Sequence, residues 1–352
     1  MKIILTGGGT AGHVMPHIAM LDGFRKNYDQ IVYIGSKNGI EKEIIEKQGN
    51  IKYYPITTTK FVRKKILANL LIPFKLIGGI SQAKKVLKEE KPNVIFSKGG
   101  FVSLPVVIAG KLLKIPIVAH ESDLYIGLAN KLSKPSVTVM CTTFEKTAND
   151  QKKNAVYTGS PMRQNMQKSK EQAKKDLRII TDKPILVVTG GSLGAQRINQ
   201  KIRNELYDLT KIYYVIHLTG KNNIDPKLEN TKDYMQIDFT QDMGTILSCA
   251  DIVVSRAGSN TIFELATLKK PMLLIPLPKG NSRGDQVDNA KYFNNMGYAN
   301  FVTEDQLEDS SLTSYINQTY KDREILKDNL VKADIKPANS KLLKIILENS
   351  LK

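Results

Sequence analysis

The sequence contains no tryptophan, only two cysteines, and no apolar stretch near the roughly 20 residues that a membrane-spanning helix needs. Cys141 and Cys249 are far apart and belong to no Cys-x-x-Cys or Cys/His pattern, so a disulfide framework and a zinc site have no support. We expect two buried, reduced thiols. The opening MKIILTGGG leads straight into a strand and a glycine turn without a signal region, so we expect a cytoplasmic location.

Acidic residues are scarce in the first half of the chain. Residues 1–160 hold 24 Lys and Arg against 11 Asp and Glu, whereas residues 161–352 hold 28 against 23. Such a basic field suits nucleic acid, an anionic membrane surface or a polyanionic substrate. Because no nucleic-acid recognition motif and no clustered aromatic platform accompany the charge, we expect no nucleic-acid partner.

The chain reads as alternating strands and helices in two similar halves. Short apolar strands at 31–36, 93–100 and 115–122 are each followed by a helical pattern, which predicts a parallel sheet. TGGGTAGHV at 6–14 and TGGSLGAQRIN at 189–199 each follow a short apolar strand, about half the chain apart. We therefore predict two doubly wound α/β domains of 1–160 and 161–337, with a last helix at 338–352 that packs back on the first.

The glycine loops predict phosphate sites, because glycine admits a close backbone approach and the next helix start offers unpaired amides. The first loop matches the dinucleotide fingerprint through Gly7, Gly9 and Gly12. The second strand, however, ends Ile34-Gly35-Ser36, without the acidic residue that holds a nicotinamide ribose. A dehydrogenase is therefore disfavoured.

Two interpretations fit SRAGSNTIFELA at 255–266. The segment either forms a second phosphate-binding helix start, with Glu264 accepting the ribose hydroxyls, or an ordinary capping box from Thr261 to Glu264. The long polar loop at 277–290 favours the first interpretation, because loops after parallel strands bind ligands in such folds.

Together these motifs resemble the MurG family of glycosyltransferases over the whole chain. The resemblance is carried by GGGTAGHV (7–14), SKGGFVSLP (97–105), HESD (120–123), GSPMR (159–163), GGSLGAQRIN (190–199), SRAGSNTIFE (255–264) and GDQVDNA (284–290). It implies the GT-B architecture, with two Rossmann-like domains facing a cleft. It also implies transfer of N-acetylglucosamine from UDP-GlcNAc to undecaprenyl-pyrophosphoryl-MurNAc-pentapeptide, called lipid I, which yields lipid II in peptidoglycan synthesis.

The resemblance also implies a set of site residues. The donor contacts are Glu264 on the ribose, Ser192 on the pyrophosphate, Arg163 on the nucleotide, Gln286 on the sugar, and Ser259, Asn260 and Thr261 on phosphate, while Thr10, Ala11 and Gly12 approach the transferred sugar. Asp123 and Thr240 complete the expected substrate contacts. The chain departs from the family at Ala11, Phe101, Asp123 and Leu193, where Gly, Tyr, Asn and Gln are frequent.

The implied reaction is an inverting displacement that needs a general base, for which we choose His13. A mere helix-start role for His13 stays open. His17 and His217 are expected to be structural, while His120 and Glu121 could assist the base, bind acceptor or be structural. No Asp-x-Asp pair occurs, so we expect no cofactor and no metal site, although a loosely bound magnesium stays an alternative.

Residues 57–80 set Arg63, Lys64 and Lys65 before an apolar run with Ile66, Leu67, Leu70, Leu71, Ile72 and Phe74. This pattern fits either an interfacial element at the cytoplasmic face of an anionic membrane or an ordinary buried helix. A different GT-B enzyme, such as a UDP-GlcNAc 2-epimerase, is the alternative function.

Overall fold

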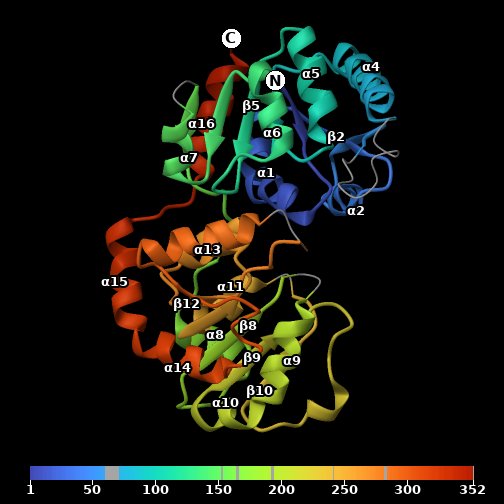
Figure 1. Ribbon diagram of the computed structural model, residues 1–352. Helices are drawn as coiled ribbons and strands as arrows, with labels where there is room; N and C mark the ends of the chain where they lie inside the picture. Colours follow the sequence, from blue (N-terminus) through green and yellow to red (C-terminus); the bar gives the residue numbers. More distant parts are fainter. Residues whose placement is uncertain are drawn as a thin grey trace. The chain divides into compact units, whose positions relative to one another are not determined.

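The computed structural model describes residues 1–59, 71–151, 154–163, 166–191, 194–240, 242–280 and 284–351. The chain divides into two compact units, one of Met1–Arg163 with Pro337–Lys352 and one of Gln164–Lys336. Each unit is an α/β sandwich around its own parallel sheet (Figure 1). The predicted pair of doubly wound parallel-sheet domains is therefore confirmed.

The first unit holds a seven-stranded sheet in the order β3-β2-β1-β4-β5-β6-β7. Its strands are β1 (Lys2–Thr6), β2 (Gln30–Ser36), β3 (Lys52–Ile56), β4 (Val94–Ser97), β5 (Ile117–Glu121), β6 (Val139–Thr142) and β7 (Ala155–Tyr157). Its helices are α1 (Met15–Asn27), α2 (Ile40–Glu46), α4 (Ile72–Glu90), α5 (Ser103–Leu112), α6 (Leu128–Ser133), α7 (Glu145–Asp150) and α16 (Asn339–Ser350), with 3-10 turns η1 (Ala11–His13) and η2 (Lys134–Ser136).

The central strands of this sheet are buried on both faces, which explains why β1, β4 and β5 are largely apolar runs rather than alternating ones. Ile3 and Leu5 of β1 pack with α1 and with Leu342 and Ile346 of α16. Ile4 faces the other way, into a cluster formed with α4 and α5. The last helix is tied down further by Ser350, whose hydroxyl lies 2.6 Å from that of Tyr28.

The second unit repeats the design with a six-stranded sheet in the order β10-β9-β8-β11-β12-β13. Its strands are β8 (Ile185–Thr189), β9 (Tyr214–Leu218), β10 (Tyr234–Ile237), β11 (Ile252–Ser255), β12 (Met272–Leu274) and β13 (Asn300–Phe301). Its helices are α8 (Lys170–Asp176), α9 (Gln196–Asn204), α10 (Leu206–Ile212), α11 (Met243–Cys249), α12 (Ser259–Thr267), α13 (Asp285–Asn295), α14 (Leu312–Lys321) and α15 (Arg323–Ala333), with the 3-10 turn η3 (Pro226–Leu228).

In each sheet the strand order reverses direction beside the first strand, which is where open α/β sheets bind ligands. The ends of β1 and β4 meet there in the first unit, since Thr6 pairs with Ser97. The ends of β8 and β11 meet in the second unit, since Thr189 pairs with Ser255. The glycine loops that the sequence singles out all leave from these strand ends.

Candidate active site

The proposed base stands on a short turn after the first glycine loop. His13 ends η1 and is half-buried, and its Nδ1 lies 2.9 Å from the hydroxyl of Thr10. Thr10 and Gly12 are exposed and Ala11 is half-buried on the same turn. If the Nδ1 proton is donated to Thr10, then Nε2 keeps its lone pair and can take a proton from a substrate.

A buried carboxylate lies beneath this loop, and no sequence motif points to it. Glu41 accepts the N–H of Gly9 at 3.2 Å through Oε2 and that of Ser36 at 3.1 Å through Oε1. One amide of the dinucleotide-like motif is thereby occupied, and the negative charge repels phosphate. The first glycine loop is consequently unsuited to hold a pyrophosphate, despite its Gly-x-Gly-x-x-Gly pattern.

The second glycine loop covers a buried lysine instead. Gly99 and Gly100 have φ of 79° and 78°, which favours glycine, and Lys98 just before them is fully buried. Its Nζ lies 2.5 Å from Nδ1 of His120 and 2.7 Å from Oγ of Ser122. Burial lowers the pKa of Lys98 to about 7.

His120 and Glu121 have structural partners inside the first unit. His120 is buried, and its Nε2 lies 2.9 Å from the carbonyl oxygen of Gly159. Glu121 accepts the backbone N–H groups of Ser122 at 2.9 Å and Asp123 at 3.1 Å. Of their three open interpretations, the contacts support the structural one, and its effect is to fix the half-buried Asp123 at the end of β5.

The two histidines expected to be structural lie in the cores. His17 is fully buried with its ring edge-on to Tyr33 and Phe96, and burial holds its pKa well below the usual value. His217 lies between the hydroxyl of Tyr234 at 2.8 Å and Oδ1 of Asn199 at 3.0 Å. Neither residue is placed for chemistry.

Phe101 packs directly on the first glycine loop. A Cβ added to Gly9 would lie 2.4 Å from Cε1 of the Phe101 ring, and the φ of Gly9 is 83°. The ring therefore keeps the loop close to the end of β4, a role that needs no hydroxyl group.

In the second unit, the glycine loop after β8 is closed tightly on itself. A Cβ on Gly190 would lie 2.4 Å from the amide nitrogen of Ala195, and Gly194 has a φ of 77° with no room beside the carbonyl of Thr219. Ser192 and Leu193 lie outside the described residues. The loop ends where α9 begins at Gln196.

Six of the helix starts described in the second unit form two groups. The side chains of Ser169, Asp242 and Ser311 cap α8, α11 and α14. The helices α9, α12 and α13, which follow β8, β11 and β12, have Ala195, Gly258 and Gly284 at the N-cap, residues without a polar side chain. Their first amides lack a carbonyl partner within the helix, which suits them to an anion.

The expected donor residues sit on one of these starts. Ser259, Asn260 and Thr261 form the first turn of α12, with Ser259 buried and Glu264 half-buried further along the helix. Because α12 begins at Ser259, Thr261 is inside the helix and cannot be an N-cap. The capping-box interpretation is therefore wrong.

Two polar residues of α13 place it against this site. Gln286 accepts the N–H of Leu277 at 3.0 Å, and Asn289 donates to the carbonyl of Ala257 at 3.2 Å, just before α12. Thr240 lies on the turn before α11, where its hydroxyl accepts the N–H of Asp242 at 3.0 Å. Arg163 is half-buried at the end of the first unit's long segment.

Glu304 joins two of these helix starts, and no sequence motif points to it. This buried carboxylate lies 2.5 Å from Arg256, in the loop before α12, and 3.1 Å from Arg197, in the first turn of α9. Arg256 also donates to the carbonyl of Ile275 after β12 at 3.1 Å. The loops after β8, β11 and β12 are thus tied to one side chain.

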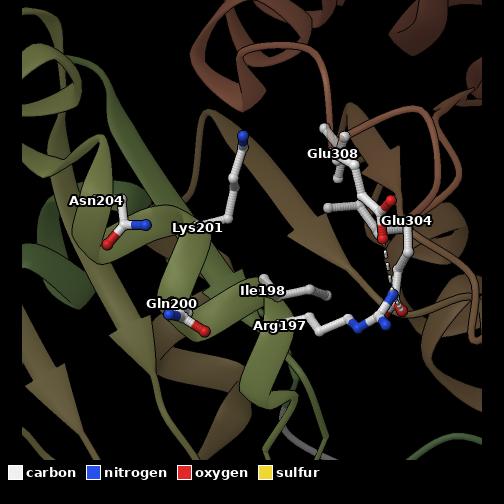
Figure 2. Close-up of a pocket in the computed structure, with 9 residues that line it drawn as sticks. Arg197, Ile198, Gln200, Lys201, Asn204, Glu304 and Glu308 are labelled. Carbon is white, nitrogen blue, oxygen red and sulfur yellow. Dashed lines mark hydrogen bonds and ion pairs between the residues drawn. The ribbon is translucent and has the colours of Figure 1, made fainter.

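Figure 2 shows Arg197 and Glu304 pointing toward each other at one end of a pocket of about 310 Å³. Its lining residues are Arg197, Ile198, Gln200, Lys201, Asn204, Ile275, Glu304, Leu307 and Glu308. None of the predicted site residues is among them. The charged groups that line the pocket pair with one another or with neighbouring side chains.

The start of α4 exposes apolar side chains. Leu71, Phe74 and Ile77 are 56%, 72% and 65% exposed, while Ala83, Val86 and Leu87 of the same helix are buried in the core. Arg63, Lys64, Lys65, Ile66, Leu67 and Leu70 lie outside the described residues. Within the described ranges, no helix is both long enough and apolar enough to span a membrane.

Comparisons with known proteins find matches to both halves of the chain. The glycosyltransferase family 28 N-terminal domain matches residues 3–142 and the family's C-terminal domain matches residues 185–343. A protein of Clostridium botulinum strain Langeland is 46% identical over 335 residues, 94% of both chains, and one of Clostridium novyi is 42% identical over 349 residues, 98% of both chains. Both are named UDP-N-acetylglucosamine--N-acetylmuramyl-(pentapeptide) pyrophosphoryl-undecaprenol N-acetylglucosamine transferase.

Solved structures share the fold. MurG of Acinetobacter baumannii superposes with a TM-score of 0.76 at 24% identity, covering 99% of each chain. UDP-GlcNAc 2-epimerase of Neisseria meningitidis, bound to UDP-GlcNAc, superposes with a TM-score of 0.63 at 15% identity, covering 100% of each chain. Both identities are low, so these structures establish the architecture and not the reaction.

Proposed function

The chain belongs to glycosyltransferase family 28, and from this premise we propose that it transfers N-acetylglucosamine from UDP-GlcNAc to lipid I, a step of peptidoglycan synthesis. The support is the identity of 46% over 94% of the chain to a relative named for that reaction. The observation in the structure that carries the proposal is the start of α12, whose N-cap is glycine and whose carboxylate Glu264 follows within the same helix.

For the donor, we assign the diphosphate to the first turn of α12. Amides of Ser259, Asn260 and Thr261 would donate to its oxygens, and the helix dipole favours the negative charge. The Glu264 carboxylate would accept both ribose hydroxyls. The carbonyl oxygen of Gln286 is held by Leu277, which leaves its NH₂ group to donate to a sugar hydroxyl.

The remaining donor contacts come from the resemblance. Ser192 is assigned to the pyrophosphate, from a position outside the described residues. Arg163 is assigned to the nucleotide, and Thr240, on the turn before α11, to a further substrate contact. Thr10, Ala11 and Gly12 are assigned to the transferred sugar.

The chemical step is an inverting displacement with one proton transfer. The 4-hydroxyl of the N-acetylmuramyl residue attacks the anomeric carbon, its proton passes to Nε2 of His13, and the bond from that carbon to the phosphate oxygen breaks with its electron pair on UDP. The leaving diphosphate gains negative charge, which fixed amides at the helix starts stabilise without reorganising. The hydroxyl of Thr10, 2.9 Å from Nδ1, would orient the His13 ring for this role.

We also propose that the enzyme attaches peripherally to the cytoplasmic face of the cell membrane. Leu71, Phe74 and Ile77 would enter the lipid interface, and the excess of Lys and Arg in the first half would face anionic headgroups. Phe74→Ser should reduce co-sedimentation with vesicles of anionic phospholipid severalfold, while the core substitution Val86→Ala should not. Equal binding of wild type and Phe74→Ser would contradict this assignment. No nucleic-acid partner is proposed.

The reaction is tested with labelled UDP-GlcNAc and a short-chain lipid I analogue. The wild type should form the labelled disaccharide product. His13→Ala should lower kcat by about 10²- to 10⁴-fold with little change in UDP affinity. Release of free N-acetylmannosamine or its nucleotide, without any transfer, would instead favour the epimerase alternative, whose fold this chain shares.

A further inference from the structure

Lys98 has a position that the assigned reaction does not use. It follows β4 directly, its side chain is buried, and its ammonium contacts only the residues that lead into the turn at Asp123, among the contacts described. Burying a lysine is costly unless the charge has partners or a purpose. Ordinary packing at this position would be served by an apolar side chain of the same length.

We propose that Lys98 is a positioning residue for the acceptor: it fixes the Ser122–Asp123 turn from beneath the second glycine loop, and its charge favours binding of an anionic acceptor to the first unit. The proposal rests on the proposed transferase function, in which the acceptor carries a diphosphate. Lys98 acts through Ser122 and His120 and not by touching the reacting atoms.

The turn is held from two sides. Nζ of Lys98 donates to the hydroxyl of Ser122 at 2.7 Å, and the carboxylate of Glu121 accepts the backbone N–H groups of Ser122 and Asp123. The second carboxylate oxygen of Glu121 accepts hydrogen bonds from the backbone N–H of Gly127 and from the side-chain amide of Asn130, both at 2.9 Å. Removing the Lys98 ammonium takes away the contact to the Ser122 side chain, while the contacts of Glu121 stay.

The same lysine stands at the junction of three loops. A Cβ on Gly7, in the first glycine loop, would lie 3.1 Å from Cβ of Lys98. A Cβ on Gly100 would lie 2.4 Å from the carbonyl oxygen of Gly8 and 3.4 Å from Nδ1 of His13. The loop that Lys98 begins is therefore packed against the loop that carries the proposed base.

The hydrogen bonds specify which groups carry protons. Because Lys98 donates to Nδ1 of His120, the ring proton of His120 is on Nε2 and is donated to the carbonyl of Gly159. Burial and the charge of Lys98 lower the pKa of His120 well below its usual value, so His120 is neutral. One positive charge, on Lys98, is left in this cluster.

That charge titrates near neutral pH. Burial lowers the pKa of Lys98 to about 7, against the opposing effects of Glu121, Asp123 and Cys141. His17, on α1, faces the same cluster and is neutral, since burial lowers its pKa. Lys98 is thus charged below about pH 7 and neutral above it, so attraction for an anionic acceptor weakens as the pH rises.

The test is steady-state transfer by full-length Lys98→Met, which keeps the length of the side chain without its charge. With a soluble lipid I analogue at pH 6.5, the acceptor KM should rise on the order of tenfold, because one unit charge is lost at short range. The KM for UDP-GlcNAc should not change. In the wild type, kcat/KM for the acceptor should decrease above about pH 7. In Lys98→Met this decrease should be absent.

Two further variants separate positioning from general damage. Lys88→Met removes an exposed lysine of α4 and should leave both KM values unchanged. Ser122→Ala removes one contact of Lys98 but keeps its charge, so the acceptor KM should rise while the alkaline fall persists.

An unchanged acceptor KM in Lys98→Met, equal rises in both KM values, or a wild-type profile without an alkaline fall would overturn the proposal. If Lys98→Met does not fold, the wild-type profile and Ser122→Ala decide the question. Absence of any transfer by the wild type would instead refute the proposed function itself.

Discussion

Glu304→Gln tests whether one buried carboxylate holds in place the helix starts that we propose bind the donor. The change keeps the shape of the side chain but removes the charge that bridges Arg256 and Arg197. Arg256 is only 13% exposed, so its guanidinium loses a partner that water replaces poorly, whereas Arg197 is 62% exposed and loses little. Removing one partner of a buried pair costs about 3–5 kcal/mol.

We expect the lower end of that range, because Arg256 keeps its hydrogen bond to the carbonyl of Ile275. The side-chain oxygen of the new glutamine can also still accept a hydrogen bond from Arg256. A loss of about 3 kcal/mol corresponds to a fall of roughly 6–12 °C in the Tm of a unit of this size. The affinity for UDP should fall about tenfold as the starts of α9 and α12 shift relative to each other. The acceptor KM should stay the same.

Calorimetric melting and titration with UDP measure these two effects. Glu308→Gln is the matched control, since Glu308 is exposed and lies 3.7 Å from Arg197 at the same pocket. It should leave Tm and UDP affinity close to those of the wild type. If Glu304→Gln lowered Tm but bound UDP normally, the clamp would stabilise the unit without setting the donor site, and the reasoning would be refuted.

Two more predictions concern donor binding and acid stability. Glu264→Gln should weaken UDP binding about tenfold through loss of a charge-assisted hydrogen bond, with the affinity for uracil alone unchanged in a competition assay. Burial lowers the pKa of His217 to about 3, below the roughly 6.5 of an unfolded histidine, so the unfolded chain binds the proton first. The stability due to neutral His217 is thus complete above pH 6.5 and falls by up to about 1.4 kcal/mol per pH unit below it. His217→Gln should make the decline of Tm between pH 6.5 and 4.5 shallower, and an unchanged slope would contradict the burial argument.

The sequence predicts the parts of this fold that depend on local pattern. Continuous apolar strands, glycine turns and the repeat at half the chain length predict two parallel sheets, because a strand buried on both faces must be apolar along its length. Gly7, Gly190 and Gly194 lie where an added Cβ would collide with another part of the backbone. The segment at 255–266 is predicted as a helix start, although only the structure identifies Gly258 as its N-cap.

The residues that the sequence does not reveal act through distant contacts. Glu304 lies 107 positions from Arg197 and 48 from Arg256, so no local motif links them. Lys98 belongs to a recognised glycine segment, but the sequence alone suggests a solvent-exposed lysine there. The structure shows it buried beside His120, because β4 pairs with β5. Glu41 likewise reads as an exposed helix residue and is found beneath the first glycine loop.

The central claim is that the donor diphosphate is held by helix starts of the second unit and not by the first glycine loop. A crystal structure of the protein with UDP tests it most directly. The account predicts the diphosphate at the first turn of α12 and the ribose hydroxyls on Glu264. UDP bound at Gly7–Gly9 above Glu41, with the start of α12 free of ligand, would contradict it.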